Sequence, residues 1–258
     1  MPPSLFDAIA DGKPLPERDL TASMTLGGAR VINVKGEGTV HPFTVMLRFK
    51  GSAAGKLFSF RLTSNASKWG NVAIDANGHV IYTAPSGVAT DCGSVAAGDD
   101  WHYITFTCYY AQKLTRLYLD DSKLLEQKVR MPLDNVQVGD AAEGVSREVS
   151  ELFFWRSALN ADEIKAVREG KMLKSSLEIY SPLYDSLTDD IPNLAQSLNK
   201  AEFVQYPTAI GSVTADESHG SVCYDTAGRR AGSQAKGVVI TVDKVSGAKA
   251  KARKVLRR

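Results

Sequence analysis

The sequence has few cysteines and no long apolar run. It contains three cysteines, Cys92, Cys108 and Cys223, and no two of them form a C-x-x-C pair. An odd number of cysteines without this spacing is not typical of a disulfide framework or of a zinc site. Cys108 alternates with apolar residues and is expected in the core, with a Cys92–Cys108 disulfide as the alternative. No apolar stretch reaches the ~20 residues of a membrane-spanning helix, so no membrane span is predicted.

A secretory leader is not visible at the start of the chain. The first residues, MPPSLFDAIADGK, lack a basic segment followed by an apolar core, and these two features mark a signal peptide. The protein is therefore either intracellular or shown without a leader that has been removed.

Acidic and basic residues are unevenly distributed, although the net charge is only +2. Residues 229–258 contain ten basic residues and one acidic residue, whereas residues 1–228 carry a net charge of −7. A basic tail can bind nucleic acid or an anionic surface. The acidic body repels phosphate, however, and no aromatic residue for base stacking follows Tyr224. We therefore predict no nucleic-acid partner, and a solvated terminus is the plainer interpretation of the tail.

Alternation of apolar and polar residues dominates from about residue 24 to residue 155. Apolar residues make up 43% of the chain and charged residues 23%, which is typical of a globular protein. Turn-forming pairs such as Asn77–Gly78 separate the alternating runs. Many short strands at this spacing predict an all-β fold, a two-sheet antiparallel jelly-roll sandwich. The clearest runs are Phe43, Val45, Leu47 and Phe49, and then Ile104, Phe106 and Cys108.

One short helix interrupts the predicted strands. Asn160 is suited to an N-cap, Glu163 completes a capping box, and Gly170 is placed to end the helix. We expect the helix over residues 160–170, lying flat against the sandwich by a narrow apolar face.

The chain is predicted to contain three parts. Residues 1–23 form a lead-in, and residues 24–206 form the jelly roll, which includes the helix and a return strand at 177–183. Residues 207–258 form a basic tail, which is either a small β unit or a flexible segment.

Three segments together resemble a known family. They are residues 98–105 (GDDWHYIT), residues 116–121 (RLYLDD) and residues 149–164 (VSELFFWRSALNADEI). Their composition, order and spacing are similar to those of laminin-G-like jelly rolls of the concanavalin A-like lectin/glucanase superfamily, over roughly residues 24–172. The resemblance implies a jelly-roll fold and a carbohydrate or another extracellular polymer as the ligand.

The tail carries a second resemblance. Residues 222–230 (VCYDTAGRR), residues 236–240 (KGVVI) and the pair Lys254–Val255 are similar to the C-terminal sorting segments of proteins exported by type IX-like secretion. This resemblance implies that the tail is an address, and that the protein is extracellular or at the cell surface and shown without its signal peptide.

Glucanases share this fold, and their activity depends on reactive carboxylates. A retaining glycosidase needs two carboxyl groups ~5–5.5 Å apart, and on one strand this requires positions i and i+2 or i+4. The best candidates, Glu148 and Glu151, are three residues apart and are expected on opposite faces. A G-x-S-x-G nucleophile motif is also missing. We therefore predict that the chain is not an enzyme.

A metal site has weak support in the sequence. The four histidines show no ligand spacing. Asp75 and Asn77, beside Gly78, could offer oxygens to calcium, but a tight hairpin turn explains these residues better. No cofactor is predicted, with calcium as the alternative.

Aromatic residues are the remaining candidates for a binding site. Flat rings cover the apolar faces of sugars at low entropic cost. Tyr103 and Tyr109 share one face of a predicted strand, and Tyr118 has the same position on the next strand. Packing of these rings under loops or a second layer is the alternative. The candidate ligand-binding residues are Trp69, Tyr103, Tyr109, Tyr110 and Tyr118.

The predicted function is that of a non-catalytic, secreted or surface jelly-roll module that binds carbohydrate or another extracellular polymer. Other domains of a surface assembly are further predicted partners. A protein-interaction or structural module of a surface protein is the alternative, because this superfamily hosts such members too. A glycoside hydrolase with an unrecognised site is the second alternative.

Overall fold

The computed structural model describes two compact units, Met1–Tyr206 and Pro207–Arg258. In the second unit, as for residues 35–40, only the backbone of the strands is described. The described residues of the first unit are 18–28, 30–40, 42–61, 69–131, 133–142, 144–185, 187, 191–195, 197 and 199–206.

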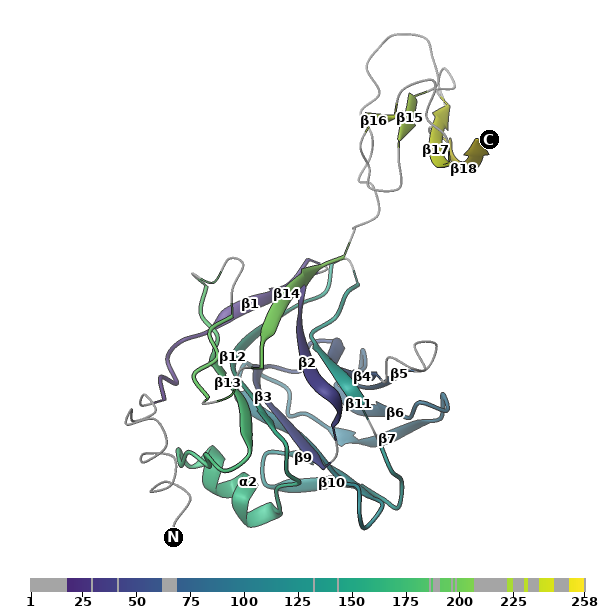
Figure 1. The fold of residues 1–258 in the computed structure, drawn as a ribbon. Coiled ribbons are helices and arrows are strands. Elements are labelled where there is room, and N and C mark those ends of the chain that lie inside the picture. Colours follow the sequence, from purple (N-terminus) through teal and green to yellow (C-terminus); the bar gives the residue numbers. More distant parts are fainter. Residues whose placement is uncertain are drawn as a thin grey trace. The chain divides into compact units, whose positions relative to one another are not determined.

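The first unit is a sandwich of two seven-stranded antiparallel sheets (Figure 1). This arrangement confirms the predicted all-β jelly-roll fold. One sheet, called sheet A, has the order β1 (Met24–Gly27), β12 (Ser146–Trp155), β3 (Phe43–Lys50), β8 (Trp101–Tyr109), β9 (Leu114–Leu119) and β10 (Ser122–Gln127), and β13 (Leu177–Pro182) also pairs with β12. The other, sheet B, has the order β14 (Ala201–Gln205), β2 (Arg30–Val40), β11 (Leu133–Val138), β4 (Gly55–Arg61), β5 (Trp69–Ile74), β6 (His79–Thr83) and β7 (Ala89–Ser94).

The main core lies between the two sheets and has aromatic rings at its centre. The Phe106 ring, fully buried, lies 4.3 Å from Phe60, 6.0 Å from Phe43 and 5.7 Å from Tyr82, measured between centroids. These residues come from both sheets, as the period-2 alternation predicts. Cys108 lies in the same core, and both Cys92 and Cys108 are free thiols. The alternative of a Cys92–Cys108 disulfide is therefore wrong.

Helix α2 (Ala161–Arg168) covers part of the outer face of sheet A (Figure 1). The predicted capping box is present: the Glu163 backbone N–H donates to Asn160 Oδ1, and the Asn160 N–H donates to the Glu163 carboxylate. Ile164 and Val167 are the buried residues of the helix. The helix therefore lies against the sandwich by a narrow apolar face, as expected.

The second unit contains a four-stranded antiparallel sheet. The described strands thus form a small β unit, which is one of the two predicted alternatives for the tail. No described helix of the protein is long and apolar enough to cross a membrane. The order of the strands is β16 (Arg230–Ala231), β15 (Val222–Tyr224), β17 (Gly237–Asp243) and β18 (Lys251–Arg257).

Candidate functional site

Two of the predicted binding residues are buried beneath helix α2. Tyr103 and Tyr118 share the outer face of sheet A, as expected, but they are only 7% and 4% exposed. They belong to a second apolar cluster that includes Phe153, Trp155 and Ile164. Their rings therefore pack under another layer and present no open face for stacking against a sugar.

The other three predicted residues lie in two further places. Tyr109, 38% exposed, ends β8, and Tyr110 follows it with the Arg130 guanidinium 4.7 Å from its ring centroid. Trp69 begins β5 in the other sheet, where the Arg61 guanidinium lies 5.2 Å from its ring. The structure therefore does not bring the five residues together into one site.

Polar side chains form a continuous row across the outer face of sheet B. Ile32, Phe58 and Val72 belong to the core between the sheets, so their strand neighbours point away from it. Backbone pairing places these outward residues opposite one another on successive strands. We call them the polar row: Glu202, Asn33, Gln137, Ser59, Asn71 and Thr83.

One end of the polar row is hydrogen-bonded and the other end is free. Asn135 Nδ2 donates to Asn33 Oδ1 at 2.6 Å, and Gln137 Nε2 donates to the Tyr206 hydroxyl at 2.6 Å. Within the described part of the chain, no hydrogen bond is recorded for the side chains of Ser59, Asn71 and Thr83. Ser59 is only 5% exposed, whereas Asn71 and Thr83 are half-buried, so the Asn71 amide and the Thr83 hydroxyl are the groups able to bind a ligand.

Two aromatic residues flank the polar row. Trp69 lies two residues before Asn71 on β5 and therefore on the same face. Tyr206, 37% exposed, follows β14 at the opposite end of the sheet. Of these residues, sequence reasoning found Trp69 and missed the others. Their alternation is visible in the sequence, but their alignment depends on pairing between strands that are distant along the chain.

The expectation that Glu148 and Glu151 point to opposite faces is wrong. Val149 pairs with Phe49 and Leu152 pairs with Leu47, so β12 contains an extra residue between these pairs. Such a bulge reverses the alternation of side chains. Both glutamates consequently contact residues of the outer face of sheet A.

Both carboxylates are occupied by cations. Glu148 accepts a hydrogen bond from Lys50 Nζ at 3.1 Å, and Glu151 is bound by Arg18 at 2.7 Å. The Ser23 hydroxyl and then the Lys50 ammonium hold the pKa of Glu148 below its usual value. A glycosidase acid needs a raised pKa and access to the bond that it protonates. Glu148 does not have a raised pKa, and Glu151 is fully buried and so has no access to a substrate.

The Asp75 segment forms a hairpin turn. Asp75 Oδ1 accepts hydrogen bonds from the backbone N–H groups of Asn77 and His79, both at 2.8 Å. Gly78 adopts a φ of +81°, which favours glycine. The backbone donors lower the pKa of Asp75. Among the described residues, no three His, Cys, Asp or Glu side chains gather in a way that could hold a metal ion.

His79 is expected to titrate above its usual pKa. Its Nδ1 lies 2.8 Å from Asp91 Oδ2, and this hydrogen bond, together with the negative charge, raises the pKa of the imidazole above 6.5. The pair contributes to stability below pH 6.5, and the contribution is lost as the pH rises through the raised pKa. In an NMR pH titration, Asp91→Asn should move the His79 pKa down toward 6.5. Equal pKa values in the variant and the wild type would contradict this assignment.

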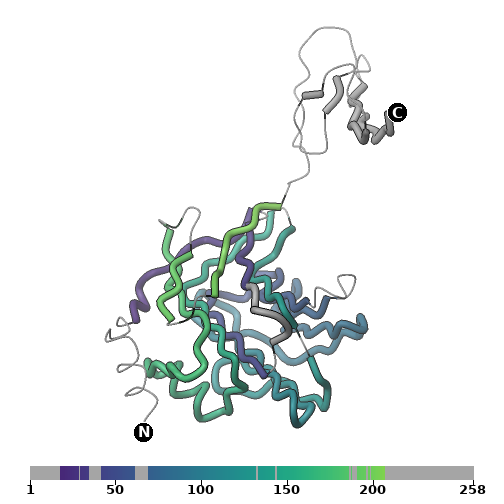
Figure 2. Tube along the Cα trace, in the orientation of Figure 1, coloured from purple at the N-terminus to yellow at the C-terminus, as the bar shows by residue number. Residues whose placement is uncertain are grey.

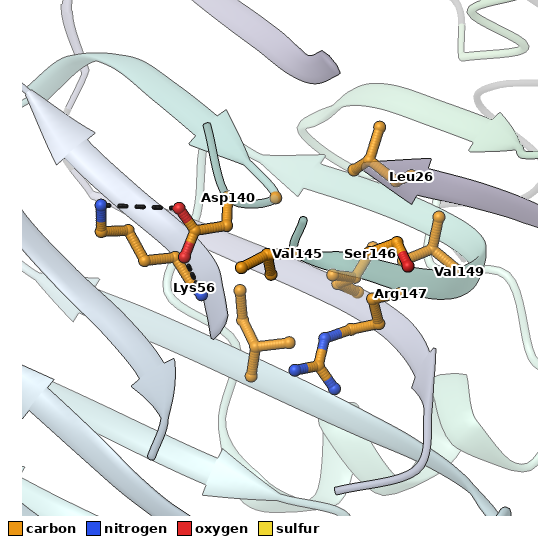
Figure 3. Close-up of a pocket in the computed structure, with 10 residues that line it drawn as sticks. Leu26, Lys56, Asp140, Val145, Ser146, Arg147 and Val149 are labelled. Atoms are coloured by element: carbon orange, nitrogen blue, oxygen red, sulfur yellow. Dashed lines mark hydrogen bonds and ion pairs between the residues drawn. The ribbon is translucent and has the colours of Figure 1, made fainter. Parts of the chain in front are cut away.

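The enclosed pocket near the start of β12 is too small for a sugar. Its volume is about 10 Å³, which is room for about one water molecule. Figure 3 shows Lys56 and Asp140 paired at one side and the Arg147 guanidinium below them. Arg147 donates to the carbonyl oxygens of Gly51 and Ala53, and burial lowers its pKa to about 10. This arginine therefore anchors the turn after β3.

Two larger hollows lie beside helix α2. One, of about 310 Å³, is lined by Ser157, Glu163 and Met172 among others. The second, of about 290 Å³, is lined by Tyr118 and by charged residues that include Arg116 and Glu126, which pair with each other at 2.8 Å. Neither hollow presents a broad exposed ring, so the outer face of sheet B is the stronger candidate site.

Comparison with known proteins supports the fold. No family model matches the sequence, and no characterised protein of similar sequence was found. Among solved structures, the chain is similar to a putative carbohydrate-binding protein of Bacteroides ovatus, at 15% identity and a TM-score of 0.55, over 74% of this chain and 59% of that one. At this identity the likeness shows the fold alone.

Two further solved structures are similar over a shorter part of the chain. They are a SAP-like pentraxin of Limulus polyphemus (14% identity, TM-score 0.45, 58% of this chain and 82% of that one) and domains LG4–5 of the mouse laminin α1 chain (11% identity, TM-score 0.42, 58% and 46%). The resemblance of the tail to sorting segments is not addressed by these structures and stays a prediction.

Proposed function

We propose that the first unit is a non-catalytic carbohydrate-binding module, and that a glycan chain lies across the strands on the outer face of sheet B. The observation that carries this proposal is the polar row, with Trp69 on the same face. The Bacteroides ovatus protein of the same fold is itself described as a putative carbohydrate-binding protein.

The polar row suits a repeating neutral ligand. Strands are 4.7–4.9 Å apart, so a row over six strands extends roughly 24 Å. A glycan chain presents hydroxyl groups at regular intervals, and each can both donate and accept a hydrogen bond. The uncharged amide of Asn71 and hydroxyl of Thr83 can satisfy such hydroxyls without burying an unpaired charge.

Trp69 would supply the apolar contact. A sugar ring has an apolar C–H face that a flat indole covers, and an indole has few torsions to restrict on binding. The Arg61 guanidinium, 5.2 Å from the Trp69 ring centroid, holds the indole through a cation–π contact. The ring is therefore positioned before any ligand arrives, which reduces the entropic cost of binding.

Replacing Trp69 by alanine should weaken glycan binding by at least about 10-fold, because burial of a large apolar side chain contributes ~1.5–3 kcal/mol. The ligand is first found by a glycan-array screen with and without calcium, and affinities are then measured by calorimetry. Tyr109→Ala, at an exposed aromatic position outside sheet B, is the matched control and should bind as the wild type does.

Two results would contradict the proposal. If the wild type binds no plant, host or microbial glycan, the module serves protein interaction or structure. If Tyr109→Ala loses binding while Trp69→Ala retains it, the ligand lies at the end of β8, where Tyr109 and Tyr110 are found. Release of reducing sugar from any polysaccharide would revive the glycoside hydrolase alternative.

We also propose that the protein works outside the cell or at its surface, with residues 207–258 as a sorting segment. The tail's likeness to type IX-like sorting segments supports this location. Deleting residues 207–258 in a host that carries such a system should leave the protein inside the cell envelope. Normal export of the shortened chain, detected by immunoblotting of the medium and surface fractions, would contradict the sorting role.

A further inference from the structure

The first described residues form a segment that lies along β12 on the outer face of sheet A. We call residues 18–23 the clasp; Figure 2 shows it at the start of the coloured trace, leading into β1. Arg48 donates to the Leu20 carbonyl oxygen at 2.7 Å, and the Ser150 hydroxyl donates to that of Ala22 at 2.6 Å. Leu20 is 41% exposed. The clasp beyond Arg18 is thus held by polar contacts with little apolar burial.

Arg18 is the buried anchor of the clasp. Its side chain is 5% exposed and faces Glu151, whose side chain is 0% exposed. The guanidinium donates from Nε to Glu151 Oε1 at 2.8 Å and from Nη2 to Oε2 at 2.7 Å. This is the two-point geometry that a planar guanidinium offers and an ammonium cannot reproduce.

The rest of the pocket also matches a guanidinium group. Arg18 Nη2 donates to the Tyr103 hydroxyl at 3.0 Å, and Nη1 donates to the carbonyl oxygen of Val167. That carbonyl is in the last turn of α2, where the helix dipole favours a cation. The Phe153 ring lies 5.2 Å from the guanidinium carbon, within cation–π range.

Every group that receives Arg18 belongs to the sandwich or to α2. Glu151 lies inside β12, which pairs with β13 and β3, and its side chain is fully buried. When Arg18 leaves, the buried carboxylate keeps the hydrogen bond from the Tyr103 hydroxyl at 2.7 Å but loses its cation, which is strongly unfavourable. The pocket therefore keeps its affinity for a guanidinium, whichever chain supplies it.

We propose that this pocket is a receptor for an arginine side chain, and that the clasp of a second copy of the protein fills it when the two copies exchange their N-terminal segments. When two copies exchange an identical segment, each segment makes in the partner the same contacts that it makes within its own chain. Only the polar contacts of the clasp must be released and remade. The pocket thus defines an interaction surface whose partner is residues 18–23 of another copy.

The test uses the full-length Arg18→Ala variant, in which the receptor is empty. A synthetic peptide with the sequence of residues 17–24 (ERDLTASM) is added, and the melting temperature is followed with increasing peptide. We expect a saturable rise, at least 10-fold stronger in apparent affinity than for the same peptide with lysine in place of arginine. The wild type, whose pocket is filled, should not respond.

One further variant and a refolding measurement also test the receptor. The double variant Arg18→Ala/Glu151→Gln should lose the rise in melting temperature. Equal rises with the arginine and lysine peptides, or no rise with either, would contradict the assignment of the pocket as an arginine receptor. If Arg18→Ala does not fold alone, refolding in the presence of the arginine peptide should recover folded protein, and no recovery counts against the proposal.

Exchange between copies is tested with two full-length variants. Arg18→Ala has an empty receptor, whereas Glu151→Ala keeps Arg18 without its receptor. Mixing them should produce a one-to-one dimer in native mass spectrometry, which neither variant forms alone. If this dimer does not form although the peptide raises the melting temperature, the pocket binds only the clasp of its own chain, and the proposed exchange between copies is contradicted.

Discussion

Replacing Arg18 by methionine is expected to lower the free energy of unfolding by about 3–5 kcal/mol, the usual cost of removing one partner of a buried ion pair. Glu151 is fully buried in β12 and loses the cation that balances its carboxylate. The methionine fills space but donates no hydrogen bond. Urea denaturation followed by tryptophan fluorescence measures the effect. Trp155 is a suitable probe because it packs in the apolar cluster with Phe153 and Tyr103, which both contact Arg18.

Two comparisons show whether the effect comes from the buried charge. Arg116→Met breaks a bridge to Glu126, whose carboxylate is 40% exposed, so it should change stability far less. Arg18→Met/Glu151→Leu removes both charges and should recover most of the lost stability. If Arg18→Met costs no more than Arg116→Met, then the Arg18–Glu151 pair does not support the fold.

Phe106→Ala is expected to destabilise the first unit by about 3–5 kcal/mol, because a large core side chain is replaced by a cavity. Phe106 is fully buried, and its ring contacts Phe43 on its own sheet and Phe60 and Tyr82 on the other. The loss therefore weakens the packing of one sheet on the other. Thermal and urea unfolding measure it.

Two matched variants serve as controls for the destabilisation expected from Phe106→Ala. Phe106→Leu keeps most of the apolar volume and should cost clearly less than Phe106→Ala. Tyr109→Ala, three residues along the same strand but 38% exposed, should stay within about 0.5 kcal/mol of the wild type. A Phe106→Ala effect as small as that of Tyr109→Ala would show that the two sheets do not pack around this ring.

The pattern of residues predicted most of the fold. Alternation such as Phe43, Val45, Leu47 and Phe49 places one face of a strand in the core whatever the other strands do. The helix also followed from local chemistry, since Asn160 and Glu163 satisfy each other's backbone donors within one turn. Both signals act over a few residues and do not depend on distant parts of the chain.

The proposed binding face could not be predicted in the same way. Alternation correctly placed Tyr103 and Tyr118 on one face, but α2 covers that face with Ile164 and Val167. On the opposite sheet, Asn33 and Ser59 lie in one row only because Gln137 pairs with both of them. No local pattern contains this alignment.

The amino-acid order by itself therefore determined the strands, the capped helix and the inward faces, because hydrophobic burial and backbone capping act between near neighbours. Only the tertiary structure decided which outward face α2 covers, where the bulge turns Glu151 toward Arg18, and which polar groups meet across sheet B. These depend on strand register and on layers that cover one another, and such contacts join residues that are far apart along the chain.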